Sequence, residues 1–439
     1  MHIDSGATAW VLVSAALVLL MTPGLAFFYG GMVRSKHVLA MLMQNVVCMG
    51  IVGVLWVLAA YSLAFGKDAG FGLIGDAHQF GLAHMQEAVA GYHGALAQSI
   101  PPLAFVAFQL MFAVITPALI TGGIADRVKF GAFAVFVVIW LLVVYAPIAH
   151  WVFSPEGWLF QRGAEDFAGG TVVHANAGAA ALALVLVLGK RVGWPREPMR
   201  PHNLPFTLLG AGLLWFGWFG FNAGSALGAN QTAAYAFVNT NTATAAAMLA
   251  WLLVERLRDG HPTTLGAASG AVAGLVAITP AAGYVSPLGS IAIGLVAGAV
   301  CACAIGLKYR LGYDDALDVV GVHLVGGVLG ALLIGFFGTA RVGGANGLFY
   351  GGSAGLLGEQ ALAVVTAVGY SFVVTYLLAK LLDKVIGLRV SRDDEHAGLD
   401  ATLHAETAYD LGAVRTGGAL TARVPGTSGD APQTVAYRT

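Results

Sequence analysis

Long apolar stretches without a charged residue dominate the pattern of hydrophobic and polar positions along the chain. Eleven such stretches can be drawn, at residues 7–27, 43–65, 99–124, 131–152, 168–188, 204–225, 233–254, 264–280, 288–307, 319–339 and 360–379. Each has about 17–26 residues, the length that a helix needs to cross roughly 30 Å of hydrocarbon. A surface helix of a water-soluble protein would carry charges on one face, and these stretches carry none. The pattern predicts an all-α integral membrane protein with eleven transmembrane helices.

Composition and the placement of basic residues add an orientation. Of the residues, 58% are hydrophobic and 10% are charged, against about 25% charged in soluble domains. Sixteen Lys and Arg residues fall in the loops that follow odd-numbered stretches, and only three fall in the other loops. Basic loops stay in the cytoplasm. We therefore expect a multi-pass protein of the cell membrane with its N-terminus outside and its C-terminus inside.

A weak internal repeat relates the two halves of the chain. The sequence Ile-Thr-Pro-Ala occurs at 115–118 and again at 278–281, in the third and eighth stretches. Val-His in the fifth stretch, at His174, is echoed in the tenth, at His323. A shift of five crossings reverses the direction through the membrane, so the pattern predicts an inverted five-plus-five repeat with one helix added. Such repeats place a substrate site near the membrane midplane.

The two histidines are the main candidates for chemistry. Ionisable groups at membrane depth are costly and usually mark a substrate pathway. The span boundaries put the two side chains about 15 Å apart in depth, so they can touch only if both helices begin at the floor of deep funnels. We predict such funnels at both faces, with the imidazoles within about 4 Å of each other. Asp166 and Asp318 precede the two stretches. The three cysteines show no metal-ligand spacing, and the sequence predicts neither a metal nor a cofactor.

Several long motifs resemble the ammonium transporter family, the Amt/Mep/Rh superfamily, on its Amt branch. The most specific is DFAGGTVVHANAG at 166–178, and the resemblance covers roughly residues 7–410. The other matching stretches are PGLAFFYGGMVRSK at 23–36, FQLMFAVITPALITGGIADR at 108–127, WFGWFGFNAGSA at 215–226 and DDALDVVGVH at 314–323. The resemblance implies a homotrimer with one pore in each subunit.

The resemblance also implies a role for individual residues. His174 and His323 match the twin histidines that line the pore and transfer protons. Phe112 and Phe221 match the two phenyl rings that close the outer pore mouth. The remaining matches form the outer substrate-binding site, namely Asp166, Phe153, Trp218 and Ser225.

Phe153 departs from the family pattern, in which this aromatic residue is a tryptophan. Phenylalanine is a weaker cation-π partner than tryptophan and has no N–H group. Two alternatives stay open: Phe153 serves with reduced affinity, or Trp151 contributes from a shifted backbone.

The domain organisation follows from the same resemblance. Residues 1–387 are the expected transmembrane transporter domain, and 388–412 resemble the family's cytoplasmic regulatory tail, which is implicated in block by PII-type signalling proteins. Residues 413–439 are rich in Gly, Thr, Pro, Ala and Arg, a composition typical of a disordered extension.

The expected function is channel-like transport of ammonium, with methylammonium as an analogue. An aromatic cage collects the cation, and deprotonation and passage through an apolar pore follow. Two alternatives are an ammonium sensor with low conductance and a Rh-type ammonia gas channel. An enzyme that uses the histidines as bases or metal ligands is less favoured, because no carboxylate or cysteine lies near them in the sequence. We therefore expect no enzymatic activity and no nucleic-acid partner.

Overall fold

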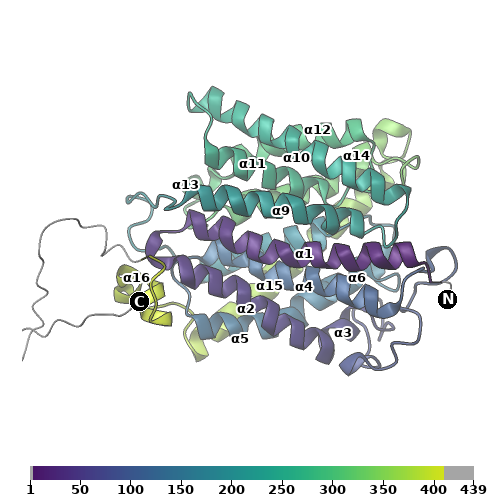
Figure 1. Ribbon diagram of the computed structural model, residues 1–439, viewed down its shortest axis with the longest axis horizontal. Helices are drawn as coiled ribbons and strands as arrows, with labels where there is room; N and C mark the ends of the chain where they lie inside the picture. Colours follow the sequence, from purple (N-terminus) through teal and green to yellow (C-terminus); the bar gives the residue numbers. More distant parts are fainter. Residues whose placement is uncertain (1–2, 410–439) are drawn as a thin grey trace, which may run out of the picture.

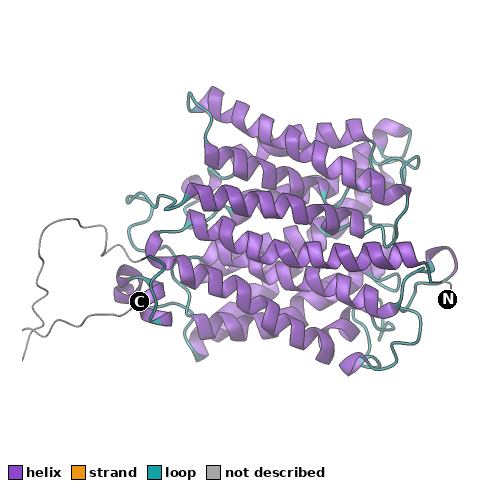
Figure 2. Ribbon diagram, in the orientation of Figure 1, coloured by secondary structure: helices purple, strands orange, loops and turns teal. Residues whose placement is uncertain are grey.

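The computed structural model describes residues 3–409, and in this part of the chain the regular elements are helices joined by loops, with no β-strands (Figures 1 and 2). Ten helices in it are long and apolar enough to cross a membrane, and α11 (Thr264–Ile278) is a shorter apolar helix of 15 residues. Together they account for the eleven predicted crossings. The N-terminus and the end of the described chain lie at opposite ends of the bundle (Figure 1). We call these ends the N-terminal face and the C-terminal face.

The helices follow one another in chain order and form the eleven crossings. Four crossings combine an α-helix with one π-helical turn, and the others are single helices. Their bounds are α1 (Ser5–Met32), α2 (Val38–Leu55) with Trp56–Ala60 and α3 (Tyr61–Phe65), α4 (Pro102–Ile124), α5 (Phe130–Trp140) with Leu141–Tyr145 and α6 (Ala146–Phe153), Gly170–Ala175 with α8 (Asn176–Leu188), α9 (Leu204–Gly224), α10 (Gln231–Arg258), α11, α12 (Pro287–Ala304), Val320–Leu324 with α14 (Val325–Phe337), and α15 (Ala354–Val385).

Short elements connect or follow these crossings. They comprise α7 (Trp158–Gln161), α13 (Leu307–Leu311), α16 (Arg392–Ala397) and α17 (Leu399–His404), with single 3-10 turns at Ser35–His37, Phe80–Leu82, Gly94–Leu96 and Leu348–Tyr350. Several crossings are longer than the charge-free stretches that predicted them. The α10 helix runs on through Arg258, and α15 begins six residues before its stretch. Helix ends can carry charges because they leave the hydrocarbon for the interface.

Two glycines allow the histidine-bearing segments to cross at close range. Gly178 lies four residues after His174, and a Cβ there would overlap the backbone of Leu324. Gly327 lies four residues after His323, and a Cβ there would come within 2.6 Å of the Gly170 carbonyl oxygen. Small residues let membrane helices approach until their backbones touch. The two glycines are thus reciprocal, each facing the segment that carries the other histidine.

A buried ionic cluster anchors the turn that leads into the second histidine segment. The guanidinium of Arg191 binds the Asp314 carboxylate at 2.8 and 3.0 Å, and Arg127 donates to the Asp314 carbonyl oxygen at 2.6 Å. Burial by itself would raise the pKa of Asp314, but the hydrogen bonds and charge of Arg191 outweigh burial, so this pKa lies below its ordinary value. The carboxylate therefore stabilises the fold at neutral pH, and this contribution is lost in acid, as the pH falls through the lowered pKa.

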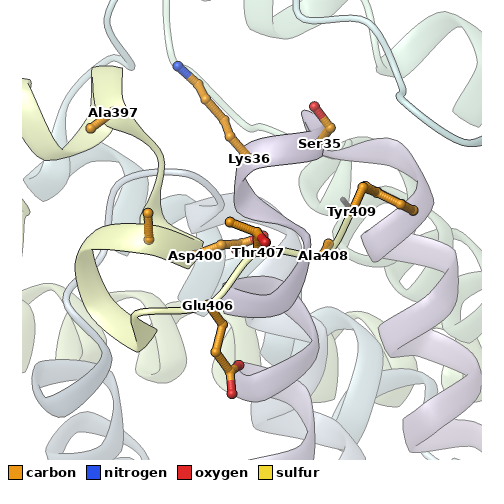
Figure 3. Close-up of a pocket in the computed structure, with 9 residues that line it drawn as sticks. Ser35, Lys36, Ala397, Asp400, Glu406, Thr407, Ala408 and Tyr409 are labelled. Carbon is orange, nitrogen blue, oxygen red and sulfur yellow. The ribbon is translucent and has the colours of Figure 1, made fainter. Parts of the chain in front are cut away.

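The segment after α15 packs against the C-terminal face. The Asp400 carboxylate accepts a hydrogen bond from the Ala40 backbone N–H at 2.9 Å, and His202 contacts the Tyr409 hydroxyl at 2.8 Å. Asp400 and Tyr409 line a pocket beside Ser35 and Lys36, as Figure 3 shows. The regulatory role predicted for residues 388–412 stays a prediction, and the extension predicted at 413–439 lies outside the described residues.

We expect Gly178→Ala to destabilise the protein, because the added methyl group meets backbone that cannot move aside. Overpacking of this kind costs about 1–3 kcal/mol. Gly212→Ala in α9 is a matched control, since a Cβ there has no neighbour within 4 Å. Alanine is the better helix former by about 1 kcal/mol, so the control should be neutral or slightly stabilising. Thermal unfolding of the purified variants checks this, and equal unfolding temperatures would contradict the proposed close crossing.

Candidate functional site

The two histidines meet inside the bundle. The Nδ1 atoms of His174 and His323 are 3.2 Å apart, and the ring centroids are 5.3 Å apart. Both side chains are buried. The predicted contact is therefore present. A hydrogen bond between two Nδ1 atoms needs one donor and one acceptor, so the accepting ring is a neutral imidazole. When both rings are neutral, one presents an N–H and the other a lone pair at Nε2.

Aspartates position the start of each histidine segment. The Asp166 carboxylate accepts hydrogen bonds of 2.7–3.1 Å from four successive backbone N–H groups, those of residues 169–172. Asp315 does the same for Val319 and Val320 at 3.1 and 2.7 Å. These N–H groups have no partner within the helix, so a carboxylate that binds them lets a helix begin away from water.

The spacing of these aspartates identifies the counterpart of Asp166 in the second histidine segment. Asp166 precedes His174 by eight residues, and Asp315 precedes His323 by eight residues. Asp315, and not Asp318, is therefore the counterpart of Asp166. Asp318 instead forms an ion pair of 2.6 Å with Lys308. The sequence places Asp318 nearer to the histidine, but only Asp315 reaches the free N–H groups.

Two phenyl rings cover the histidines toward the N-terminal face. Phe112 of α4 and Phe221 of α9 have ring centroids 4.2 Å apart with 34° between their planes. Both are buried, and the Phe221 ring centroid is 5.9 Å from that of His174. The predicted pair is thus in direct contact and lies next to the first imidazole.

A cavity of about 280 Å³ lies beyond the phenyl pair. Its lining includes Phe112 and three of the four predicted binding residues, Asp166, Phe153 and Ser225. The Ser225 hydroxyl donates to the Phe221 carbonyl oxygen at 2.8 Å, so its own oxygen keeps lone pairs that can accept. This cavity corresponds to the funnel predicted at this face. The funnel at the opposite face stays a prediction.

Trp218 lies elsewhere than expected. It is not among the residues that line the cavity, and its ring stacks on His174 with centroids 5.3 Å apart and 17° between the planes. Its indole N–H donates to the Thr279 hydroxyl at 2.8 Å. Because Trp218 is one helical turn before Phe221, α9 carries it past the phenyl pair to the level of the histidine.

The two aromatic residues at the end of α6 differ in their contacts. Trp151 donates its indole N–H to the Leu73 carbonyl oxygen at 2.7 Å and packs against Tyr370, so it does not line the cavity. Phe153 does line it, and its ring meets that of Phe112 edge-on with centroids 6.4 Å apart. Of the two residues, Phe153 is the one that borders the cavity, and its part in binding stays a prediction.

Some residues of the site were not predicted from the sequence. Tyr92 comes from the long loop between α3 and α4, lines the cavity, and donates its hydroxyl to the Phe153 carbonyl oxygen at 3.2 Å. Gln109 of α4 also lines the cavity. No motif indicates Tyr92, since only the path of the loop brings it there. The repeated eight-residue spacing between aspartate and histidine could have identified Asp315.

Comparison with known proteins agrees with this geometry. The model of the Ammonium Transporter Family matches residues 9–409. An ammonium transporter of Mycobacterium tuberculosis is 54% identical over 447 aligned positions, which cover 96% of this chain and 93% of the relative.

Solved structures give the same result. A mutant of Candida albicans Mep2 superposes with a TM-score of 0.84 at 34% identity, covering 93% of each chain. A structure described as a sensor Amt protein superposes with a TM-score of 0.83 at 32% identity, covering 90% of this chain and 98% of that one. This eleven-crossing membrane protein, with its paired imidazoles beneath a phenyl pair, belongs to the ammonium transporter family.

Proposed function

We propose that the protein is a channel-like transporter that collects ammonium in the cavity at the N-terminal face, passes one of its protons to an imidazole of the His174–His323 pair, which carries it onward, and conducts the resulting ammonia past the same two rings. The observation that carries this proposal is the 3.2 Å contact between His174 and His323, next to a closed phenyl pair. A polar pair in an otherwise apolar passage serves a substrate that can both donate and accept hydrogen bonds.

Recruitment of the cation rests on the residues that line the cavity. Phe112 and Phe153 offer π faces, each contributing about 0.5–2 kcal/mol to cation binding depending on desolvation. Ser225 can accept an N–H from the ion. Asp166 acts differently, because its oxygens are already committed to four backbone N–H groups. Its charge attracts the cation from behind without direct ligation.

Selectivity arises beyond the phenyl pair. A potassium ion that left the cavity would lose its hydration shell with no replacement, since the passage is apolar apart from the imidazoles. Ammonium differs because it can release a proton and continue as ammonia. The Nε2 atoms of the two rings then offer one donor and one acceptor to the neutral molecule. Trp218, stacked on His174, holds that ring in its plane.

We also propose the arrangement in the cell. The N-terminal face is external and the C-terminal face cytoplasmic, on the basis of the distribution of basic residues. The family resemblance supports a homotrimer and a PII-type partner at the C-terminal face. The packed segment ending at Tyr409 is the part of the described chain placed to meet such a partner.

Two other functions are kept as alternatives. A sensor that binds ammonium but conducts poorly is favoured by the likeness to a structure described as a sensor Amt protein. A Rh-type gas channel would lack the cation site, and the cavity lined by Asp166 and Ser225 speaks against it. Uptake of methylammonium into vesicles separates a transporter from a sensor. An enzymatic role is not proposed, since the relatives are named transporters.

We expect His174→Ala to reduce transport-linked current at least about tenfold, because positioned acid–base groups typically contribute more than this to proton transfer. The measurement is ammonium-evoked current in proteoliposomes containing wild type or variant. Val173→Ala is the matched control, because it removes methyl groups from a fully buried neighbour but leaves the imidazole. Equal currents in wild type and His174→Ala would refute the proposed proton transfer.

Phe153→Trp should strengthen recruitment of ammonium. Indole is the better cation-π partner, and a gain of about 1 kcal/mol corresponds to a roughly fivefold lower KM for methylammonium uptake. The new side chain enters a cavity of about 280 Å³, which has room for it. Phe80→Trp, an exposed position on the same face, controls for a general effect of tryptophan. An unchanged or raised KM would mean that residue 153 does not contact the cation.

A further inference from the structure

Two histidines and a glutamate gather on the loop between α3 and α4, at the N-terminal face and outside the pore described above. The rings of His78 and His84 stack with centroids 4.1 Å apart and 12° between their planes. The Nε2 atom of His78 is 3.7 Å from Oε2 of Glu87. One ligand atom from each of the three residues lies within 4.8 Å of the other two. We propose that these residues form a binding site for a divalent transition metal, with Zn²⁺ as its probe.

The donor atoms suit this class of metal. Zn²⁺ binds imidazole nitrogen at about 2.0–2.1 Å and carboxylate oxygen at about 2.0–2.2 Å, so ligand atoms around a tetrahedral ion are roughly 3.3 Å apart. The separation between His78 and Glu87 is already near that value. Closing the site requires at least one imidazole to rotate out of the stack, which exposed side chains can do. Ca²⁺ and Mg²⁺ prefer oxygen ligands alone and are poorly matched.

The loop backbone holds the three residues in place before any metal arrives. Gln79, next to His78, is buried and donates its backbone N–H to the Ser62 hydroxyl at 3.0 Å. Met85, next to His84, is also buried. The Glu87 N–H bonds the His84 carbonyl oxygen at 3.1 Å. Two buried neighbours therefore orient the exposed ligands toward one another.

An ordinary ion pair explains this arrangement less well. The His78 and Glu87 side chains are 49% and 62% exposed, and ion pairs this exposed contribute little to stability because water and salt screen them. A metal ion uses both rings in their neutral form and satisfies the carboxylate as well.

The site is connected to the pore mouth through its own loop. Tyr92 and Leu96, further along the same loop, line the outer cavity. A metal that joins residues 78, 84 and 87 would therefore restrict the segment that borders substrate entry. Metal binding itself does not depend on the proposed transport function or on the orientation in the membrane.

The test uses tag-free, full-length protein in detergent without substrate. Isothermal titration with Zn²⁺, together with elemental analysis after dialysis, should give one bound ion per chain for wild type. His84→Ala and Glu87→Gln should each weaken binding at least about tenfold, since even partners outside the ligand set change affinity by about 10–100-fold. His93→Ala, at another exposed histidine of the same loop, should bind as wild type does.

A second measurement guards against binding elsewhere and against misfolding. Zn²⁺ should slow hydrogen exchange of residues 77–92 in wild type but not in His84→Ala, while methylammonium uptake without added Zn²⁺ stays the same in both. Absence of Zn²⁺ binding to wild type overturns the proposal. Equal affinity and stoichiometry for wild type and His84→Ala overturn it as well. Because binding is measured without substrate, failure of transport would leave this result standing.

Discussion

The contact between His174 and His323 is the interaction on which the rest of the site depends, and it is costly to make inside a membrane. Two helix starts must be brought into the middle of the bundle, where no water can satisfy their free N–H groups. Asp166 and Asp315 supply acceptors for these groups, each eight residues before its histidine. Gly178 and Gly327 have no side chain at the two points where a Cβ would keep the segments apart.

In the transport mechanism that we propose, the same arrangement determines how ammonium is selected. The phenyl pair lies between the outer cavity, where we propose that rings and a hydroxyl hold the cation, and the two imidazoles, which we propose line an apolar passage. Neither part distinguishes ammonium from potassium alone, because the cavity attracts both and the passage repels every ion. In this proposal ammonium is selected because the two parts act in sequence. The cavity holds the substrate as a cation, and the passage admits it only after it has lost a proton. The contact between His174 and Phe221 places this change directly behind the phenyl pair.

Much of the fold could be predicted because hydrophobic length is a local property. The charge-free stretches predicted the number of crossings. They ended before the observed helix wherever that helix continues past the hydrocarbon, as α10 does. The family resemblance led to Phe112, Phe221, Phe153 and Ser225, which the structure brings together at one face. The roles of these residues remain proposals. Trp218 was assigned to the cavity because sequence spacing does not reveal how far along the pore axis a side chain lies.

By itself, the sequence determined the membrane class, the number of crossings and the chemical character of the pore, because each follows from residue type and run length. Only the tertiary structure decided which side chains meet. In it Asp315, and not the nearer Asp318, accepts the free N–H groups of the second histidine segment. Trp151 donates to the Leu73 carbonyl oxygen, and Phe153 lines the cavity. The tertiary structure also brought Tyr92 to the cavity and gathered His78, His84 and Glu87 on one loop. The reason is physical: contacts between distant segments depend on where backbones can approach and where loops return, and neither is encoded in any single stretch.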